Sequence, residues 1–400
     1  MLKKTSKKTP LASAGAARRK FLGGASAAAM SSALAACAQE APQPAAKPAL
    51  PMPVAPAVAT SSNINLRWQS TWPASDIFHE YALDYAKKVN DMSGGRLKIE
   101  MLPANAVVKA ADLIDAVSKG VLDGGHGVTA YWYAKNTAVA LWGAGPAFGM
   151  DANLLLAWHY YGGGKALLEE IYKGLNLDVV SFLYGPMPTQ PLGWFNKPVI
   201  KVEDFKGLKY RATGLAADLF KGMGATVNAL AADEIVPAMG KGVLDAAALN
   251  NASSDRQLGF ADVAKVCMLQ SYHQPGEQFE ILLNKKRYDA LPGELKAMVQ
   301  TAAEAASADM SWKAVHRYSQ DYLELQSRNN VRFHQTPDAV LRKQLQVWDG
   351  IAAKKSEENP LFKRVYHSQR AFAARAVRWQ HDTVVGARLA LDHFFDGKKG

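Results

Sequence analysis

Apolar and polar residues follow strand-like and helix-like periods along the first part of the predicted folded body. Positions 64–69 and 97–102 fit strands, and the second of these alternates between apolar and polar residues. The apolar positions between them recur at the spacing of an amphipathic helix: Phe78, Tyr81, Ala82, Tyr85, Val89 and Met92. Gly94 and Gly95 end this helix. The strand–helix–strand order predicts an α/β fold with a largely parallel sheet.

One five-residue sequence, Lys-Gly-Val-Leu-Asp, occurs twice, at 119–123 and at 241–245. Each copy follows a short amphipathic stretch (112–118 and 234–240), contains a glycine that can end a helix, and leads into a short apolar run. Chance identity over five common residues is one explanation. The matching context on both sides favours another, in which two lobes are built on the same helix–turn–strand unit.

These two units also indicate where a ligand would bind. In open α/β sheets, ligands bind beyond the carboxyl ends of the strands. This rule selects residues 129–133, which include Tyr131 and Trp132, after the first copy, and Asn250 and Asn251 after the second.

The chain from about 295 to 395 is predicted to be predominantly helical, with breaks at Pro337 and Pro360. Its last helix is expected to span about 372–395. The apolar residues on its two sides are Phe372, Ala376, Trp379, Ala387, Ala390 and Phe394 on one, and Val377, Val384 and Leu391 on the other. A helix that is apolar on two sides is either buried between lobes or shared with a partner chain.

The composition is that of a globular protein. The 400 residues include 47 Lys and Arg against 36 Asp and Glu, a net charge of +11, and 48% of them are hydrophobic. The length favours two lobes, because single cores stop growing at roughly 250–300 residues. Seven basic residues lie in 1–38, which hold no acidic residue, and 40 basic against 36 acidic residues remain beyond them, a charge of +4. The excess charge is therefore in a leader and does not indicate nucleic-acid binding.

Residues 1–37 have the layout of an export signal, with a basic start and an apolar stretch that is too short to span a bilayer permanently. Adjacent Arg18 and Arg19 resemble a twin-arginine signal, and an ordinary secretory signal is the alternative. Cys37 ends a lipobox-like sequence and is either a lipidation site or a chance cysteine beside the cleavage site. Residues 38–62 are rich in Ala and Pro and read as an extended spacer. We expect a periplasmic protein, either free or anchored by a lipid at Cys37.

The sequence contains none of the common catalytic signatures. It lacks a Gly-x-x-x-x-Gly-Lys-[Ser/Thr] phosphate loop, a His-Glu-x-x-His zinc motif and a Gly-x-Ser-x-Gly nucleophile elbow. Its nine histidines show no pair at metal-ligand spacing. We therefore expect a protein that is not an enzyme and that holds no cofactor or metal.

Large aromatic and polar residues occur instead at predicted loop positions: Trp68, Trp72, Tyr131, Trp132, Tyr133, Gln190, Trp194, Arg211, Tyr272 and His273. Aromatic side chains can form the walls of a small-molecule site, and one guanidinium can hold a carboxylate by two parallel hydrogen bonds. Arg211 ends a short alternating stretch, which places Lys209 and Arg211 on the same face of a strand. A surface salt bridge is the alternative role for such an arginine.

Nine short segments carry a resemblance to a known family: WP at 72–73, MSGGRLK at 92–98, GHG at 125–127, YYGGG at 160–164, GWF at 193–195, FKGLKYR at 205–211, EIVPA at 234–238, HQPG at 273–276 and LNKK at 283–286. Together and in this order they resemble the substrate-binding subunits of tripartite ATP-independent periplasmic (TRAP) transporters, the DctP family, in the group similar to α-keto acid-binding proteins. The resemblance implies a two-lobed α/β periplasmic binding protein of the TRAP solute-receptor type, with long C-terminal helices.

The resemblance also implies a domain organisation and a function. Lobe I is expected at 63–186 and 276–330, lobe II at 187–275, and a C-terminal helical segment at 331–400. The lobes are expected to close on a small organic acid, a 2-oxo or 2-hydroxy monocarboxylate, and to deliver it to the membrane permease subunits. A ligand-sensing periplasmic lipoprotein and, less favoured, an enzyme exported in folded form are the alternatives.

In this family the strand arginine, here Arg211, pairs with the ligand carboxylate, and Gln190 matches a residue that helps to coordinate a bridging cation. The other expected binding residues are Trp72, Tyr131, Trp132, Trp194, Asn250, Asn251, His273 and Gln274. The chain departs from the α-keto acid group where Ala248 and Leu249 precede the two asparagines in place of a Glu-Trp pair, and where Gln274 replaces a glutamate. Losing two carboxylates removes most of the charge that attracts a hard cation, so we expect metal-independent binding. Relatives exchange the terminal helix between two subunits, which implies a homodimer.

Overall fold

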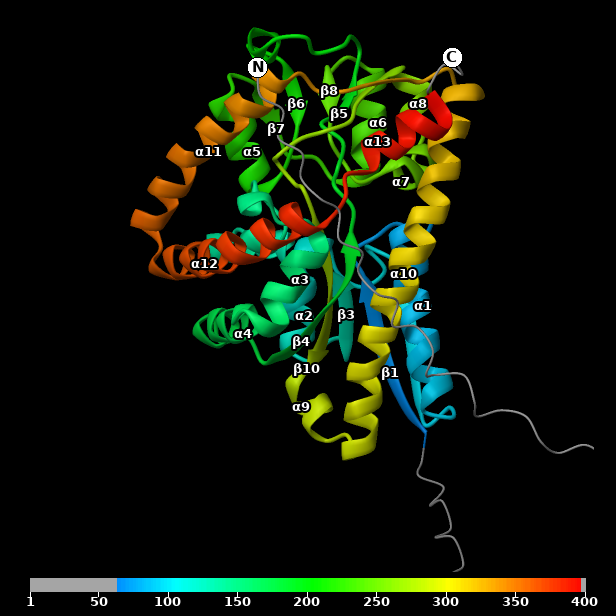
Figure 1. Cartoon of the computed structure of the whole chain (residues 1–400). Helices are drawn as coiled ribbons and strands as arrows, with labels where there is room; N and C mark the ends of the chain where they lie inside the picture. The colour runs from blue at the N-terminus through cyan, green and yellow to red at the C-terminus, as the bar shows by residue number, and fades with distance from the viewer. Residues whose placement is uncertain (1–62, 397–400) are drawn as a thin grey trace, which may run out of the picture. The chain divides into compact units, whose positions relative to one another are not determined.

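The computed structural model of the protein describes residues 63–396. The expected export signal at 1–37, with Cys37, and the expected spacer at 38–62 lie outside the described residues. The described chain forms two β-sheets with helices packed around them, and three long helices follow in its last third (Figure 1).

The first sheet of the described chain has the spatial order β2–β1–β3–β10–β4. Its strands are β1 (Ile64–Ser70), β2 (Leu97–Leu102), β3 (Gly124–Gly127), β4 (Val179–Met187) and β10 (Glu277–Asn284). β1 pairs in parallel with β2 and β3, whereas β10 runs antiparallel to β3 and β4. The two strands predicted near the start of the body are confirmed.

The second sheet, again within residues 63–396, has the order β11–β9–β5–β8–β6–β7. Its strands are β5 (Gly193–Phe195), β6 (Lys209–Arg211), β7 (Thr226–Asn228), β8 (Ala246–Ala247), β9 (Val266–Met268) and β11 (Arg332–His334). β6 is parallel to β7 and β8, and β9 is parallel to β11. β5 runs antiparallel to β8 and β9.

Both sheets are mixed, but within residues 63–396 four of the five strands of the first sheet and five of the six of the second run in one direction, as predicted for a largely parallel sheet. The exceptions are β10 and β5. The chain crosses from the first sheet to the second between β4 and β5, and returns between β9 and β10. β5 and β10 therefore begin at the edge where β4 and β9 end. With no crossover helix before it, a strand entered in this way runs antiparallel to its neighbours. The two crossing segments, 188–192 and 269–276, join the sheets.

Helices cover the faces of the sheets. Those of the described chain are α1 (Ile77–Met92), α2 (Leu113–Ser118), α3 (Ala152–Tyr161), α4 (Gly164–Gly174), α5 (Gly214–Gly222), α6 (Ala232–Gly240), α7 (Ala252–Gln257), α8 (Phe260–Val263), α9 (Lys285–Asp289), α10 (Gly293–Ser327), α11 (Asp338–Glu358), α12 (Pro360–Thr383) and α13 (Ala387–Leu391). α1 matches its predicted position: Asp76 caps it by accepting a hydrogen bond from the backbone N–H of Phe78 at 3.0 Å.

The long helix α10 contacts elements of both sheets. It packs on α1 and β4 beside the first sheet and on α7 beside the second, and Figure 1 shows it running alongside α1. An ion pair between Lys88 and Asp309 at 2.5 Å links α10 to α1. A second one, between Arg256 and Asp321 at 2.5 Å, links it to α7.

The two Lys-Gly-Val-Leu-Asp sequences adopt the same local structure, which confirms the predicted shared unit. Gly120 and Gly242 lie two residues after the ends of α2 and α6. Their φ angles of 74° and 70° favour glycine. Asp123 Oδ2 accepts a hydrogen bond from a backbone N–H of β1 at 2.8 Å. Asp245 Oδ2 accepts the equivalent bond from β6 at 3.0 Å. Each unit thereby fixes its strand in parallel beside an earlier one, β3 beside β1 and β8 beside β6.

The C-terminal region is helical as predicted, with α11 and α12 starting at the breaks at Pro337 and Pro360. The expected single helix at 372–395 is wrong, because α12 ends at Thr383 and the backbone of Val384 is extended. α13 and a π-helical turn (Asp392–Asp396) follow. Apolar residues recur across this break at helical spacing, so the pattern alone did not reveal it.

Of the stretch 372–395, only the first residues pack on the rest of the protein. Phe372, Ala373 and Ala376 of α12 are buried, and α12 contacts α3 and α4. The large apolar side chains beyond them are exposed: Trp379, Val384, Val385, Leu389, Leu391, Phe394 and Phe395. Burial between the lobes therefore does not explain the two apolar sides.

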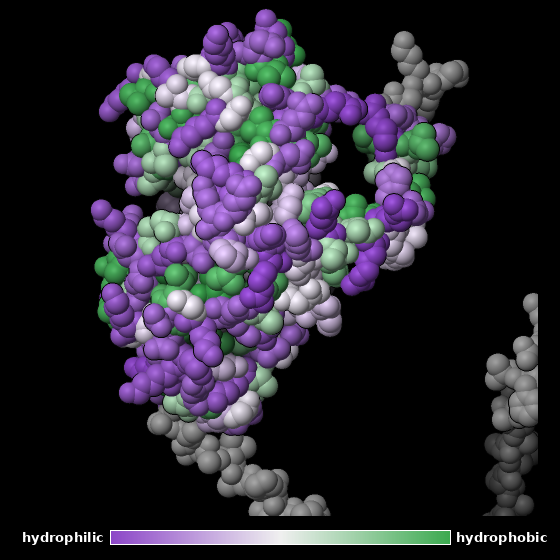
Figure 2. Space-filling view, turned by 90° about the vertical axis from the view of Figure 1, so that its left-hand side faces the viewer, coloured by the Kyte–Doolittle hydropathy of each residue, from purple (hydrophilic) through white to green (hydrophobic). Residues whose placement is uncertain are grey.

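The hydrophobic core lies on both faces of each sheet. Separate clusters of buried residues cover the two faces of the first sheet, and two further clusters cover those of the second. On the side formed by α4, α11 and α12, hydrophilic side chains predominate, with smaller hydrophobic patches between them (Figure 2). Among residues 63–396, none of the helices has the length and apolar character needed to cross a membrane.

Candidate ligand-binding site

Arg211 ends β6 of the second sheet and is only 7% exposed. Its Nε donates to the carbonyl oxygen of Leu230 at 3.0 Å, and its Nη1 donates to that of Ala248 at 2.9 Å. Within residues 63–396, Nη2 has no protein acceptor and the guanidinium forms no ion pair. The alternative of a surface salt bridge is therefore wrong. Burial lowers the pKa of Arg211, and the neighbouring Tyr131 and Asp255 oppose that shift.

Tyr131, which follows β3 of the first sheet, lies near Arg211. It lies on a short 3-10 helix (Thr129–Trp132) directly after β3, and its ring packs on that of Trp72 with centroids 5.7 Å apart. Burial raises the pKa of Tyr131, and the charge of Arg211 opposes this effect, while Glu277 reinforces it. The Tyr131 hydroxyl is therefore neutral, and ionisable side chains from both sheets act on it.

The two crossing segments supply three further predicted residues. His273 Nε2 lies 3.0 Å from Gln190 Oε1, and His273 Nδ1 lies 2.6 Å from Ser271 Oγ. The backbone N–H of Gln190 donates to the carbonyl oxygen of Gln274 at 3.1 Å. Burial lowers the pKa of His273 to about 3, so the imidazole is neutral. These contacts hold the crossing segments side by side.

Glu277 is a site residue that the sequence did not single out. It is the first residue of β10, it is 5% exposed, and its Oε2 accepts a hydrogen bond from Gln274 Nε2. Burial raises its pKa to about 8. The absence of a side chain at Gly143 leaves room for the Glu277 side chain, because a Cβ at that position would lie 2.6 Å from the Cγ of Glu277. The sequence signal was a glutamate directly after the HQPG segment, three positions from Gln274.

Two more buried carboxyl groups lie between α1 and α7. Asp76 Oδ2 accepts from Ser254 Oγ at 3.0 Å, which joins the start of α1 to α7. Asp255 of α7 accepts from Trp194 Nε1 at 2.8 Å and from the backbone N–H of Asn250 at 3.1 Å. Burial raises the pKa of Asp76 to about 6 and that of Asp255 to about 7.

Three of the predicted aromatic residues are directed into the core. Trp132 Nε1 donates to Glu280 at 2.7 Å, Trp194 Nε1 donates to Asp255, and Trp72 Nε1 donates to His126 Nδ1 at 2.9 Å. Their indole N–H groups are already paired with buried partners, so they are not free to bind a ligand. Trp72 reaches the cluster around Arg211 only through its ring contact with Tyr131.

The two predicted asparagines organise α7. Asn251 caps the helix by accepting from the backbone N–H groups of Ser253 and Ser254 at 3.0 Å. Asn250 Nδ2 donates to Ser254 Oγ at 2.9 Å and lies 3.4 Å from Asp76 Oδ2. The structure therefore places Arg211 near Tyr131, and it groups Gln190, His273 and Gln274 on the crossing segments. Glu277 links the two groups, because it contacts Gln274 and acts on Tyr131. The asparagines lie at the contact between α1 and α7.

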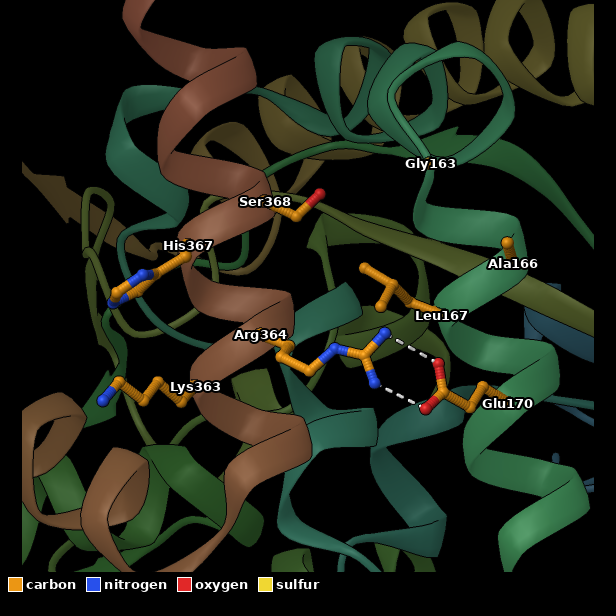
Figure 3. A pocket seen from close by; sticks show the side chains of 8 residues that line it. All are labelled: Gly163, Ala166, Leu167, Glu170, Lys363, Arg364, His367 and Ser368. Atoms are coloured by element: carbon orange, nitrogen blue, oxygen red, sulfur yellow. Dashed lines mark hydrogen bonds and ion pairs between the residues drawn. The ribbon is translucent and has the colours of Figure 1, made fainter.

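A surface hollow of about 570 Å³ lies between α4 and α12 (Figure 3). Figure 3 shows Arg364 reaching across it to Glu170, in a bidentate ion pair with distances of 2.5 and 2.9 Å. Lys363 and His367 point away from this pair. Because the charge across the hollow is already neutralised, we place the candidate ligand site at Arg211.

Comparisons with known proteins agree with this architecture. The sequence profile of the bacterial extracellular solute-binding proteins, family 7, matches residues 69–355. A monocarboxylate 2-oxoacid-binding periplasmic protein of Nostoc sp. is 30% identical over 319 residues, which cover 79% of this chain and 86% of that protein.

Two solved TRAP solute-binding proteins have similar structures. One, from Bordetella bronchiseptica, is a dimer with bound calcium and picolinate; it is 26% identical, with a TM-score of 0.77, and the match covers 83% of this chain and 97% of that one. The other, from Colwellia psychrerythraea, has bound calcium and pyruvate; it is 29% identical, with a TM-score of 0.77 and coverage of 83% and 100%.

Proposed function

Since the chain belongs to family 7 of the bacterial extracellular solute-binding proteins, we propose that it captures a 2-oxo monocarboxylate between its two sheets. It is a periplasmic solute-binding protein of the TRAP type, and proteins of this family bind a solute without converting it. The units that close on the solute are lobe I (63–186 and 276–330) and lobe II (187–275). The Nostoc relative, named for 2-oxo acids, supports the ligand class.

The burial of Arg211 without an ion-pair partner among residues 63–396 is the observation that carries this proposal. A buried cation without a counter-ion is costly, and a ligand carboxylate removes that cost. The carbonyl oxygens of Leu230 and Ala248 fix the guanidinium plane and leave the Nη2 donors for the ligand. Each charge-assisted hydrogen bond contributes about 1.5–3 kcal/mol.

The residues around Arg211 then select the rest of the solute. Tyr131 supplies a neutral hydroxyl, and Gln190 and Gln274 supply amide groups beside it. His273 positions Gln190, and Trp72 supports the ring of Tyr131. Asn250 and Asn251 stabilise the contact between α1 and α7. Trp132 and Trp194 support the site by packing in the core.

A cation does not fit this site well. Calcium prefers 6–8 oxygen ligands, several of them carboxylates. Residues 63–396 contain no group of three or more His, Cys, Asp or Glu side chains placed to hold a metal ion. At Arg211, the carboxyl group beside Gln190 and Gln274 is that of Glu277, and it is already paired with Gln274. We therefore propose that binding here is metal-independent, unlike in the calcium-containing relatives.

Calorimetric titration with pyruvate and with branched and aromatic 2-oxo acids tests the proposal. We expect binding in the presence of a chelator, and at least a tenfold loss of affinity in Arg211→Lys, which keeps the charge but loses the planar fork. Arg328→Lys at the exposed end of α10 is the control and should bind like the wild type. Wild-type affinity in Arg211→Lys would contradict the role of Arg211.

The finer assignments concern partners and the leader. We propose that the loaded protein delivers its solute to the permease subunits of a TRAP transporter. The exposed apolar residues after Ala376 and the dimeric Bordetella structure support a homodimer formed through the C-terminal segment. Residues 1–37 support export by the twin-arginine route, with lipid attachment at Cys37.

A further inference from the structure

Glu277 differs from the other buried carboxyl groups in how few donors it meets. Glu280 receives three hydrogen bonds, from Trp132, Tyr172 and Ser181, at 2.6–2.7 Å. Asp76 and Asp255 each receive at least two. Glu277 receives one, from Gln274 Nε2, in the described part of the chain. The second oxygen of Glu277 receives no hydrogen bond from residues 63–396 and is not fully enclosed by them, so it is available to pair with a solute.

The surroundings of Glu277 identify that partner. Glu277 and Arg211 both act on the Tyr131 hydroxyl, so the carboxyl group belongs to the cluster that holds the proposed solute. Gln274 and its neighbour Gln190 separate it from His273. If the carboxylate of a ligand pairs with Arg211, we expect its next polar atom near Tyr131 and Glu277.

The protonation state of Glu277 decides which polar atom it can bind. The ionisable groups that face this part of the cluster are Tyr131 from the helix after β3, Arg211 from β6, Asp76 at the start of α1 and His273 from the crossing segment. Burial is the cause of the raised pKa of Glu277, about 8, and no cation of the described chain opposes it. At neutral pH the group is a carboxylic acid: its carbonyl oxygen accepts from Gln274, and its O–H is a donor.

We propose that Glu277 is a specificity-determining residue that donates a hydrogen bond to the 2-oxo oxygen of the solute, or to another acceptor at that position. This inference rests on the proposed function. The proton of Glu277 then supplies at this position the positive partner that calcium can supply to an acceptor oxygen. It also explains why a chain with few carboxylates at the site would not need a cation.

The proposal defines a ligand class and a pH dependence. An acceptor at position 2, as in a 2-oxo acid, is matched by the neutral acid, whereas a 2-ammonium group would require the ionised form. Ligand binding should therefore weaken above pH 8, by up to tenfold per pH unit, because the ionised carboxylate faces the lone pairs of the ligand.

Calorimetric titration of the full folded protein with pyruvate at pH 6, 7, 8 and 9, in the presence of a chelator, tests the proposal. The wild type should bind with constant affinity at pH 6–7 and lose affinity at pH 9. Glu277→Gln keeps an N–H donor, so we expect affinity within about fivefold of the wild type at pH 7 and no loss at pH 9. Glu277→Ala should lose at least tenfold at pH 7, and Glu294→Gln on the exposed start of α10 should behave like the wild type.

The ligand-free protein provides a second, independent readout. Infrared difference spectra between the wild type and Glu277→Gln should contain the C=O band of a protonated carboxyl group at pH 7, lost by pH 9.5. A carboxylate band at pH 7 would overturn the inference whatever the ligand. So would an affinity for pyruvate that rises with pH and requires added calcium, because Glu277 would then be an ionised cation ligand. Failure of the wild type to bind any 2-oxo acid would instead contradict the proposed function, and the infrared band would still decide the state of Glu277.

Discussion

Burial sets the protonation of the side chains around Arg211. It raises the pKa of Asp76, Asp255 and Glu277 and lowers that of Arg211 itself. The result is one strong hydrogen-bond donor among acids that hold their protons up to nearly neutral pH or beyond. At pH 7 the Glu277 side chain is therefore mainly neutral, whereas Asp255 is partly and Asp76 mainly ionised.

Asp255 makes the stability of the protein depend on pH. Its pKa rises from 3.8 to about 7 on folding, so the folded state holds a proton between these values that the unfolded chain has released. The free energy of unfolding should therefore fall as the pH rises from about 4 to 7. Urea unfolding at pH 5 and pH 8 should give a smaller difference for Asp255→Asn than for the wild type.

The matched control for this experiment is Asp233→Asn, on the exposed first turn of α6. It should keep the wild-type difference between the two pH values. The informative quantity is the change in the free energy of unfolding between pH 5 and pH 8. The absolute stability is less informative, because the amide in Asp255→Asn faces the N–H of Asn250 and lowers stability at every pH. An unchanged slope in Asp255→Asn would contradict the assignment.

Sequence patterns found part of this cluster. Arg211, Gln190 and His273 stood at predicted loop or strand-end positions, and the resemblance gave Arg211 its expected role. Glu277 was missed because it begins a strand whose first four residues, Glu-Gln-Phe-Glu, are mostly polar, as in an exposed segment. Every residue of β10 is in fact buried, because helices cover both faces of the first sheet. The polar start of the strand therefore did not indicate exposure.

At the scale of elements, repeated local sequence was the most reliable guide. The two Lys-Gly-Val-Leu-Asp copies predicted equivalent turns because the glycine and the aspartate each have one structural task that local sequence can specify. β11 was not predicted, since three partly polar residues, Arg332–His334, form a strand only through pairing with β9. The directions of β5 and β10 were not predictable from local sequence either, because the chain enters each of these strands from the other sheet.

The segment after α12 gives a prediction about assembly. Val385 is 85% exposed and Phe395 is 80% exposed, and apolar side chains of this size favour burial against another surface. Deletion of 384–400 should convert a dimer to a monomer without lowering the thermal midpoint of the monomer. Light scattering coupled to size-exclusion chromatography measures the mass.

Phe394→Ser combined with Phe395→Ser is a milder form of the same test and should weaken the dimer at least tenfold. Tyr161→Ser is the control, because Tyr161 is 89% exposed at the end of α3, away from this segment. A wild type that is monomeric at micromolar concentration would contradict the proposed homodimer.

At the scale of the whole molecule, most of the excess positive charge lies in the first 38 residues. Seven basic residues in 1–38 account for the difference between +11 and +4. If Arg18 and Arg19 form a twin-arginine signal, replacing both by Lys should leave the protein in the cytoplasm. Cell fractionation measures this, and Lys7→Arg combined with Lys8→Arg, earlier in the leader, should be exported normally.

Lipid attachment is tested separately by Cys37→Ser. This variant should lose metabolic labelling with a radioactive fatty acid and move from the membrane fraction to the soluble periplasmic fraction. A wild type that is exported without labelling would contradict the lipid anchor and leave the export route unaffected.

The 35 residues of α10 have a mechanical consequence. At 1.5 Å per residue the helix is about 52 Å long, and both α1 and α7 are attached to it by ion pairs. Because a helix of this length does not shorten, we expect the two sheets to move relative to each other by bending of α10 or by twisting about it. The crossing segments that carry Gln190 and His273 then act as short tethers, and they limit the angle through which the two halves can rotate.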